Sequence, residues 1–317
     1  MRLLVRSLDK AVAVLERRGV HATDVELVEG DMLDAEVVAR AVDGCDATIH
    51  AAAAIGVTGG GHISVLDQNT IGARTVIDAA LAAGHDPVVH VSSVAVFVPP
   101  VLDVIRADAP LGRPRSHYGR SKLLTELELR ARQDRGEPIT IVYPGGVIGP
   151  DQPHLDATLE GIVGARTQGW PKTTGGVCLI DVRDLADALA ATVTVGAAAP
   201  RRLVLGGRFF TWAELGALLD ELTGVRAMRV PLPKPALVGL GSFLDLLRRV
   251  RPIAYPLTRD AADFMSTMVP TDDSATLAAL GVTERPAEES LRDTVRWLSA
   301  AGHMSAKHAG LLAAPDS

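Results

Sequence analysis

Residues 87–97 read PVVHVSSVAVF, a short apolar run interrupted by two adjacent hydroxyl residues, Ser92 and Ser93. Such a run is typical of a strand buried in a parallel sheet. Ligands bind at the carboxyl ends of the strands in open α/β sheets, so we expect both serines near a binding crevice. Successive side chains of a strand point to opposite faces, and therefore only one of the two hydroxyls can face a given ligand.

A second motif follows in residues 118–122, which read YGRSK. A helix places residues four apart on one face, so Tyr118 and Lys122 are expected side by side. An ammonium beside a phenol lowers the pKa of that phenol from its usual value near ~10. Such a tyrosine exchanges a proton with a carbonyl or alcohol oxygen near neutral pH. The alternative is an exposed tyrosine beside a solvated lysine.

The composition narrows the class of protein. The chain has 317 residues, 47% of them hydrophobic and only 3% aromatic, so Ala, Val and Leu must build its core. A net charge of −6 argues against nucleic acid as a general partner. Arg2 and Arg6 interrupt the apolar start, so we expect no signal peptide. No apolar run is long enough for a transmembrane segment. Cys45 and Cys178 lack metal-ligand spacing, so we expect no metal site and a cytoplasmic protein with reduced thiols.

Strands and helices alternate along the first 150 residues. The expected strands are 2–6, 25–28, 46–50, 87–97 and 138–143. The expected helices are 8–18, 35–42, 63–83 and 118–135, and Asp34 is the expected N-cap of the second of them. Alternation of this kind predicts an α/β fold with a doubly wound, Rossmann-like parallel sheet. Beyond residue 150 the chain becomes mostly helical, although strands 178–180 and 202–205, with helix 182–195 between them, are expected to return to the sheet.

With these motifs the sequence resembles the extended branch of the short-chain dehydrogenase/reductase superfamily. That branch includes the NAD-dependent epimerases and dehydratases of sugar nucleotides, dihydroflavonol reductases and 3β-hydroxysteroid dehydrogenases. The resemblance covers residues 2–300 and implies that Ser93, Tyr118 and Lys122 are the catalytic residues, with Ser92 as a second candidate for the serine. It implies a dinucleotide-binding domain of residues 1–150 plus about 178–206, a substrate domain of 151–177 and 207–302, and a loose tail of 303–317.

The resemblance also implies cofactor contacts near the adenine. Asp31 would hydrogen-bond the adenine and Met32 would offer a backbone N–H, although Asp31 as the cap of a turn is the alternative. The small residues Ala51, Ala52 and Ala53 would let the backbone approach the dinucleotide.

Further contacts are implied near the nicotinamide. Asn69 would hold backbone groups and a water behind the catalytic lysine. The backbone of Pro144, Gly145 and Val147 would face the nicotinamide carboxamide. These assignments extend the expected site along the carboxyl edge of the sheet.

Arg6 decides the expected cofactor. It follows the strand that, in these folds, ends at the adenosine ribose, where an acid binds the 2′-hydroxyl of NAD and a cation accommodates the 2′-phosphate of NADP. We therefore expect NADP, with NAD as the second choice and a surface arginine as the alternative interpretation.

The sequence departs from the family at its front. Members open with a strand and a Gly-rich GxxGxxG turn that binds the pyrophosphate, and neither precedes the first strand here. The glycines at 56 and 59–61 are interpreted as a flexible loop near the active site. We expect weak or absent dinucleotide binding by these 317 residues. An internal start site, a decayed copy and a truncated form with another role are the explanations, and the intact downstream motifs favour the first.

The C-terminal part is expected to select the substrate. An apolar helix over 236–247 ends in Arg248, Arg249 and Arg251. We interpret it as a packed helix with cations at its favourable end. A lid over a hydrophobic substrate and a surface that touches a membrane are the alternatives.

Together the motifs predict an NAD(P)-dependent oxidoreductase that moves a hydride between a nicotinamide cofactor and a carbonyl or secondary alcohol. Tyr118 would be the general acid/base, Lys122 would tune it and hold the nicotinamide ribose, and Ser93 would bind the oxygen of a small, apolar substrate. One alternative is a nucleotide-sugar epimerase or dehydratase with retained NAD. Another is a non-catalytic cofactor-sensing or scaffold protein, or an inactive truncated form. A homodimer remains open because dimers are common in this superfamily.

Overall fold

The centre of the molecule is a parallel sheet of four strands in the order β3-β4-β5-β9. The computed structural model describes residues 1–54, 64–152, 155–248, 250–251 and 257–314. The strands are β3 (Thr48–His50), β4 (Val88–Val91), β5 (Ile139–Pro144) and β9 (Arg202–Leu205). Their register pairs His50 with His90 and Val91 with Val142. The predicted α/β class with a parallel sheet is therefore confirmed.

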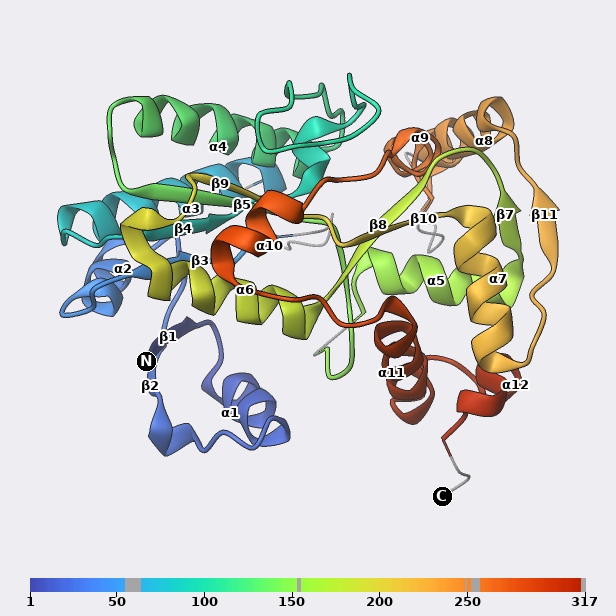
Figure 1. The fold of residues 1–317 in the computed structure, drawn as a ribbon, viewed down its shortest axis with the longest axis horizontal. Coiled ribbons are helices and arrows are strands. Elements are labelled where there is room, and N and C mark those ends of the chain that lie inside the picture. The colour runs from blue at the N-terminus through green and yellow to red at the C-terminus, as the bar shows by residue number, and fades with distance from the viewer. Residues whose placement is uncertain (55–63, 153–154, 249, 252–256, 315–317) are drawn as a thin grey trace.

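Helices cover both faces of this sheet (Figure 1). The helices α3 (Val65–Ala82) and α4 (His117–Asp134) pack on one face, and α6 (Val182–Val195) and α10 (Ser274–Leu280) pack on the other. Alternation along the strands produces this arrangement, because Val88 of β4 faces the α3 side and Val89 faces the α6 side.

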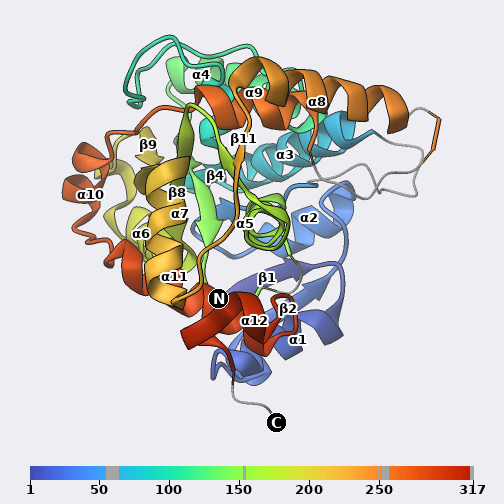
Figure 2. The same ribbon diagram turned by 90° about the vertical axis from the view of Figure 1, so that its right-hand side faces the viewer.

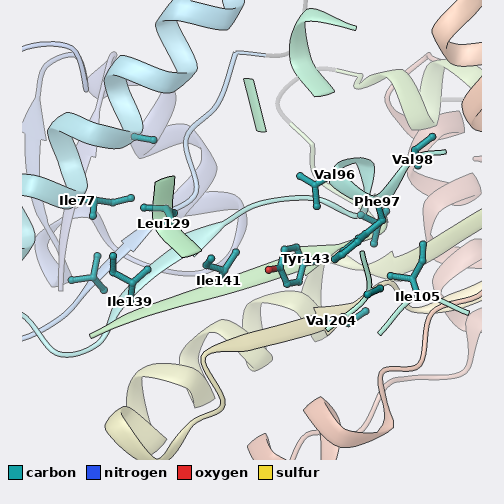
Figure 3. Packing of buried hydrophobic residues seen from close by; sticks show 14 of the residues in the cluster. Ile77, Val96, Phe97, Val98, Ile105, Leu129, Ile139, Ile141, Tyr143 and Val204 are labelled. Atoms are coloured by element: carbon teal, nitrogen blue, oxygen red, sulfur yellow. The ribbon is translucent and has the colours of Figure 1, made fainter. Parts of the chain in front are cut away.

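The core on the α3 and α4 side contains a pair of packed aromatic rings, one from the turn after β4 and one from β5. Phe97 and Tyr143 meet edge to face, with ring centroids 5.0 Å apart. Figure 3 shows both rings among Ile105, Ile141 and Val204, with the Tyr143 hydroxyl directed away from Phe97. The tyrosine thus has an apolar body and a polar end directed elsewhere in the core.

The N-terminal strands form a sheet of their own. β1 (Arg2–Val5) pairs in parallel with β2 (Glu26–Glu29), and α1 (Leu8–Arg17) lies beside them without a buried residue. Within the described ranges, no strand pairs with the second edge of β1 or with the outer edge of β3. Ile49 of β3 is 41% exposed as a result. The predicted helix cap in this region is confirmed, since Asp34 accepts hydrogen bonds from the first turn of α2 (Ala35–Val42).

The C-terminal part is built around β8 (Gly176–Asp181). This strand pairs in parallel with β6 (Gly146–Ile148) and antiparallel with β10 (Arg208–Thr211), so it does not return to the central sheet as expected, whereas β9 does. A second pair, β7 (Trp170–Lys172) and β11 (Arg229–Pro231), lies at the outer edge of this part, at the right of Figure 1 and facing the viewer in Figure 2, where β11 is labelled. The helices α5 (Ala157–Gln168), α7 (Trp212–Thr223) and α11 (Ala287–Ala300) surround these strands.

The end of the chain differs from its prediction. Residues 303–314 are packed rather than loose: α12 (Ala306–Ala309) and the short turn η4 (Gly310–Leu312) close onto α7 and α11. Met304, Ala309 and Leu312 are buried in the C-terminal core. Three separated apolar residues gave no periodic signal in the sequence, yet each fills a place in that core. Residues 315–317 lie outside the described part.

The apolar helix of the C-terminal part is packed on only one face. Leu237 and Leu244 of α8 (Lys234–Arg248) join a small core with α9 (Arg259–Thr267). Phe243 and Leu246 are each 59% exposed, so the packed helix that was expected is packed over only part of its surface. Arg249 and the glycines at 56 and 59–61 lie outside the described residues. None of the helices in the described ranges is both long and apolar enough to cross a membrane.

Candidate active site

The two serines after β4 have different environments. Ser92 is buried, and its hydroxyl donates to a Glu126 carboxylate oxygen at 3.3 Å. Ser93 is half-buried and caps the turn η2 (Val94–Phe97), with its Oγ accepting from the Ala95 N–H at 3.2 Å. A hydrogen bond also links Ser93 to the Tyr118 side chain. The structure thus brings Ser93, rather than Ser92, to the phenol.

The first turn of α4 fixes the position of Tyr118. Ser116 caps this helix, and its hydroxyl accepts from the Gly119 N–H at 3.0 Å. A Cβ on Gly119 would lie 2.6 Å from a side-chain atom of Pro114, so only glycine lets the preceding loop pack on this turn. The loop and the cap together direct the tyrosine toward the end of β4.

Lys122 is buried one turn further along the same face, with 5% of its surface exposed. Its Nζ donates to the Val91 carbonyl at 2.7 Å and lies 5.9 Å from the centre of the Tyr118 ring. Burial lowers the pKa of Lys122 to about 8, and the charge of Glu126 opposes this effect. The predicted helical neighbours are therefore together, at the carboxyl end of β4.

The expected effect of this lysine on the phenol is not found. Burial raises the pKa of Tyr118, a hydrogen bond to Ser93 opposes the rise, and the charge of Asp156 adds to it. The Lys122 ammonium lies over the Tyr118 ring and donates to a backbone carbonyl. It therefore stabilises the phenolate less than we expected from the spacing of the two residues. Tyr118 consequently keeps its proton at neutral pH and is suited to be a proton donor.

Asn69 joins the segment after β3 to α4. Its side-chain oxygen accepts from the Ala54 N–H at 2.7 Å, and its amide nitrogen donates to the Ala54 carbonyl at 3.0 Å and to Ser121 Oγ at 3.1 Å. Ser121 in turn donates to the Tyr118 carbonyl. The asparagine is buried in α3, so it holds the backbone after β3 against the first turn of α4.

The residues expected at the adenine end have varied surroundings. Arg6 is exposed directly after β1, and Ala51 and Ala52 are exposed directly after β3. Asp31 accepts from the Leu33 N–H at 2.9 Å, which is the turn cap named as the alternative to an adenine contact. The side chain of Met32 packs over Gly72 of α3, while Ala53 is half-buried.

The backbone after β5 approaches β9 and β8 closely. Pro144 ends β5, and the Gly145 N–H donates to the Leu205 carbonyl at 3.1 Å. A Cβ on Gly145 would collide with the Gly206 carbonyl oxygen, so this position requires glycine. Val147 continues in β6, where it pairs with Ile180.

Three buried polar residues lie beside the site, and the sequence motifs pointed only to His50, as a residue at the end of its strand, and not to His90 or Glu126. His50 and His90 stack with ring centroids 5.4 Å apart, and both ring nitrogens of His90 are buried without a hydrogen-bond partner among the described atoms. Burial, together with the nearby charge of Lys122, lowers the pKa of His50 to about 4. Glu126 is fully buried, and its position four residues after Lys122 was the signal that could have identified it.

These residues fit a nicotinamide dinucleotide. The ammonium of Lys122 is a hydrogen-bond donor for hydroxyl groups, and small exposed residues after β3 leave the backbone accessible. The carboxyl edge of the parallel sheet thus carries a lysine donor, a serine and a tyrosine. This combination is that of a Rossmann-type oxidoreductase.

The family follows from sequence comparison. Residues 2–206 match the NAD dependent epimerase/dehydratase family, so the chain belongs to that family of enzymes, and the resemblance to the superfamily is confirmed. "Sterol demethylase protein B" of Methylococcus capsulatus is 27% identical over 94% of this chain and 95% of that protein. "2-alkyl-3-oxoalkanoate reductase" of Shewanella oneidensis is 31% identical over 43% of this chain and 37% of that protein.

Solved structures agree on the fold. UDP-glucose 4-epimerase from Bifidobacterium longum, in complex with NAD+ and UDP, superposes with a TM-score of 0.69 and 18% identity. The superposition covers 95% of this chain and 91% of the epimerase.

Proposed function

We propose that this protein reduces the carbonyl group of a small, apolar substrate with NADPH. The observation that carries the proposal is the convergence of Ser93, Tyr118 and Lys122 at the carboxyl end of β4, with a phenol that keeps its proton. A bound nicotinamide would supply the hydride to the carbonyl carbon.

The protein side chains would handle the oxygen and the proton. The Ser93 hydroxyl would hold the carbonyl oxygen beside Tyr118. The phenol would donate its proton to that oxygen as charge develops on it, which general acid catalysis by a positioned tyrosine requires. The Lys122 ammonium would bind the nicotinamide ribose and stabilise the phenolate that remains after proton transfer.

One observation favours NADP, and two favour an apolar substrate. Arg6 is exposed at the end of β1, where its guanidinium can pair with a 2′-phosphate. Val101 and Leu102, in the loop that leads from η2 to α4, are 67% and 47% exposed. The names of the two relatives refer to a sterol and to an oxoalkanoate, and both are largely apolar molecules.

Turnover by the Tyr118→Phe variant tests the proposal. Oxidation of NADPH is measured with a panel of apolar ketones, at millimolar cofactor so that weak binding does not hide turnover. We expect kcat to fall at least ~100-fold, the range that general acid catalysis supplies. Leu127→Gln, a change at an exposed residue of the same helix, should leave kcat unchanged.

Two results would contradict the proposal. One is undiminished turnover by Tyr118→Phe. The other is purified protein that retains NAD and interconverts nucleotide sugars, which would favour the epimerase alternative.

A further inference from the structure

Glu126 is a fully buried carboxylate on the sheet-facing side of α4. One of its oxygens accepts from the Tyr143 hydroxyl and from Arg130 Nε, the latter at 2.6 Å. The other accepts from the Ser92 hydroxyl at 3.3 Å. Burial of a carboxylate is costly unless it is paired and hydrogen-bonded, so this arrangement stabilises a charge that the fold would otherwise exclude.

The partners of Glu126 come from three elements that meet at the active site. Ser92 directly follows β4 and precedes Ser93, Tyr143 lies near the end of β5, and Arg130 is one turn along α4. The Tyr143 ring is held by Phe97, with its hydroxyl directed away from that contact (Figure 3). The carboxylate therefore connects the catalytic helix to the carboxyl ends of two strands.

We propose that Glu126 is a positioning residue that keeps Lys122 in its ammonium form and holds α4 in register with the ends of β4 and β5. The inference rests on the proposed function, because it assigns a second charge to the same site. Helix geometry places Glu126 on the face that carries Lys122 and Tyr118, since the three residues are spaced by four.

The electrostatic part follows from what surrounds the lysine. The titratable groups that face Lys122 are His50 of β3, His90 of β4, and Tyr118 and Glu126 of α4. Burial lowers the pKa of both histidines and raises that of the tyrosine, so these three are neutral near pH 7. Glu126 then provides the negative charge that offsets burial of the ammonium.

Titration of the lysines by NMR, with ¹³C label at the ε-carbon, tests this without any turnover. The chain contains five lysines, and Lys10, Lys172, Lys234 and Lys307 are exposed, so Lys122 should titrate apart from them. A Lys122→Met spectrum assigns its signal. We expect Glu126→Gln, which keeps the shape but removes the charge, to lower the protonation constant of Lys122 at least threefold.

Tyr143→Phe is the matched control, because it removes a hydrogen bond to Glu126 and keeps the charge. We expect it to lower the thermal midpoint while the Lys122 titration stays as in the wild type. If Glu126 had only a structural role, both Tyr143→Phe and Glu126→Gln would lower the thermal midpoint and leave the Lys122 titration unchanged. An unchanged Lys122 titration in Glu126→Gln would therefore overturn the proposal.

Arg130→Gln covers the case in which Glu126→Gln does not fold. Without the Arg130 guanidinium, the negative charge of the Glu126 carboxylate is less neutralised. The protonation constant of Lys122 should therefore rise. An unchanged constant would also overturn the inference. Failure of the proposed function is distinct, because it would appear as turnover by Tyr118→Phe whatever the lysine titration shows.

Discussion

Lys122 makes the stability of the protein depend on pH. Its pKa is about 8 in the folded protein and 10.5 in an ordinary setting. Between these values the unfolded chain binds a proton that the folded chain does not, so the free energy of unfolding rises with pH. Relative to Lys122→Met, the wild type should gain about 3 kcal/mol from pH 8 to 10.5.

Denaturant unfolding across this pH range measures that gain. Lys234→Met, which changes an exposed lysine, should leave the pH dependence of the wild type as it is. If the free energy of unfolding depended on pH in the same way in the wild type and in Lys122→Met, the Lys122 amine would not be buried in its charged form at lower pH.

Single residues show what local sequence can predict. The spacing of Tyr118 and Lys122 gave their common helix face, because helix geometry depends only on neighbours in the chain. The direction of the Tyr118 pKa shift was wrong, because burial and the charge of Asp156 come from distant segments. The burial of Glu126 was missed for the same reason, although its spacing was visible.

At the scale of elements, alanine substitutions at two glycines test the effects of close packing and of helix propensity on stability separately. Gly145, between β5 and β6, has no room for a methyl group beside the Gly206 carbonyl, whereas Gly161 lies in α5 with open space around it. Gly145→Ala should cost at least ~2 kcal/mol through overpacking, and Gly161→Ala should stabilise by up to ~1 kcal/mol through helix propensity.

Urea unfolding of the two variants measures both effects. Equal and small changes at the two positions would mean that the turn after β5 is loosely packed, and the backbone path proposed to face the cofactor would then lose its support.

Elements were predicted best where their signals are local. Asp34 caps α2 as expected, because the cap depends on the next three residues. The partner of β8 was not predicted, because a short apolar strand does not specify which strand it joins. β8 pairs with β6 and β10 rather than with the central sheet.

At the scale of the whole molecule, the parallel sheet followed from the alternation of strands and helices. The separate pairing of β1 with β2 did not, because it depends on which strands lie beside them in space. Residues 303–314 were expected to be loose and are packed, since Leu312 and Ala309 complete a core formed by helices far away in sequence.

We propose, as the central claim, that a reduced nicotinamide meets a carbonyl group beside Tyr118 at the carboxyl edge of the sheet. Transfer of deuterium tests it most directly. The protein is incubated with NADPH deuterated at C4 and an apolar ketone, and the alcohol product is analysed by mass spectrometry. We predict one deuterium on the carbinol carbon with wild-type protein and almost none with Tyr118→Phe in the same time. An alcohol product without deuterium from either C4 position, or equal labelling by the variant, would contradict the account.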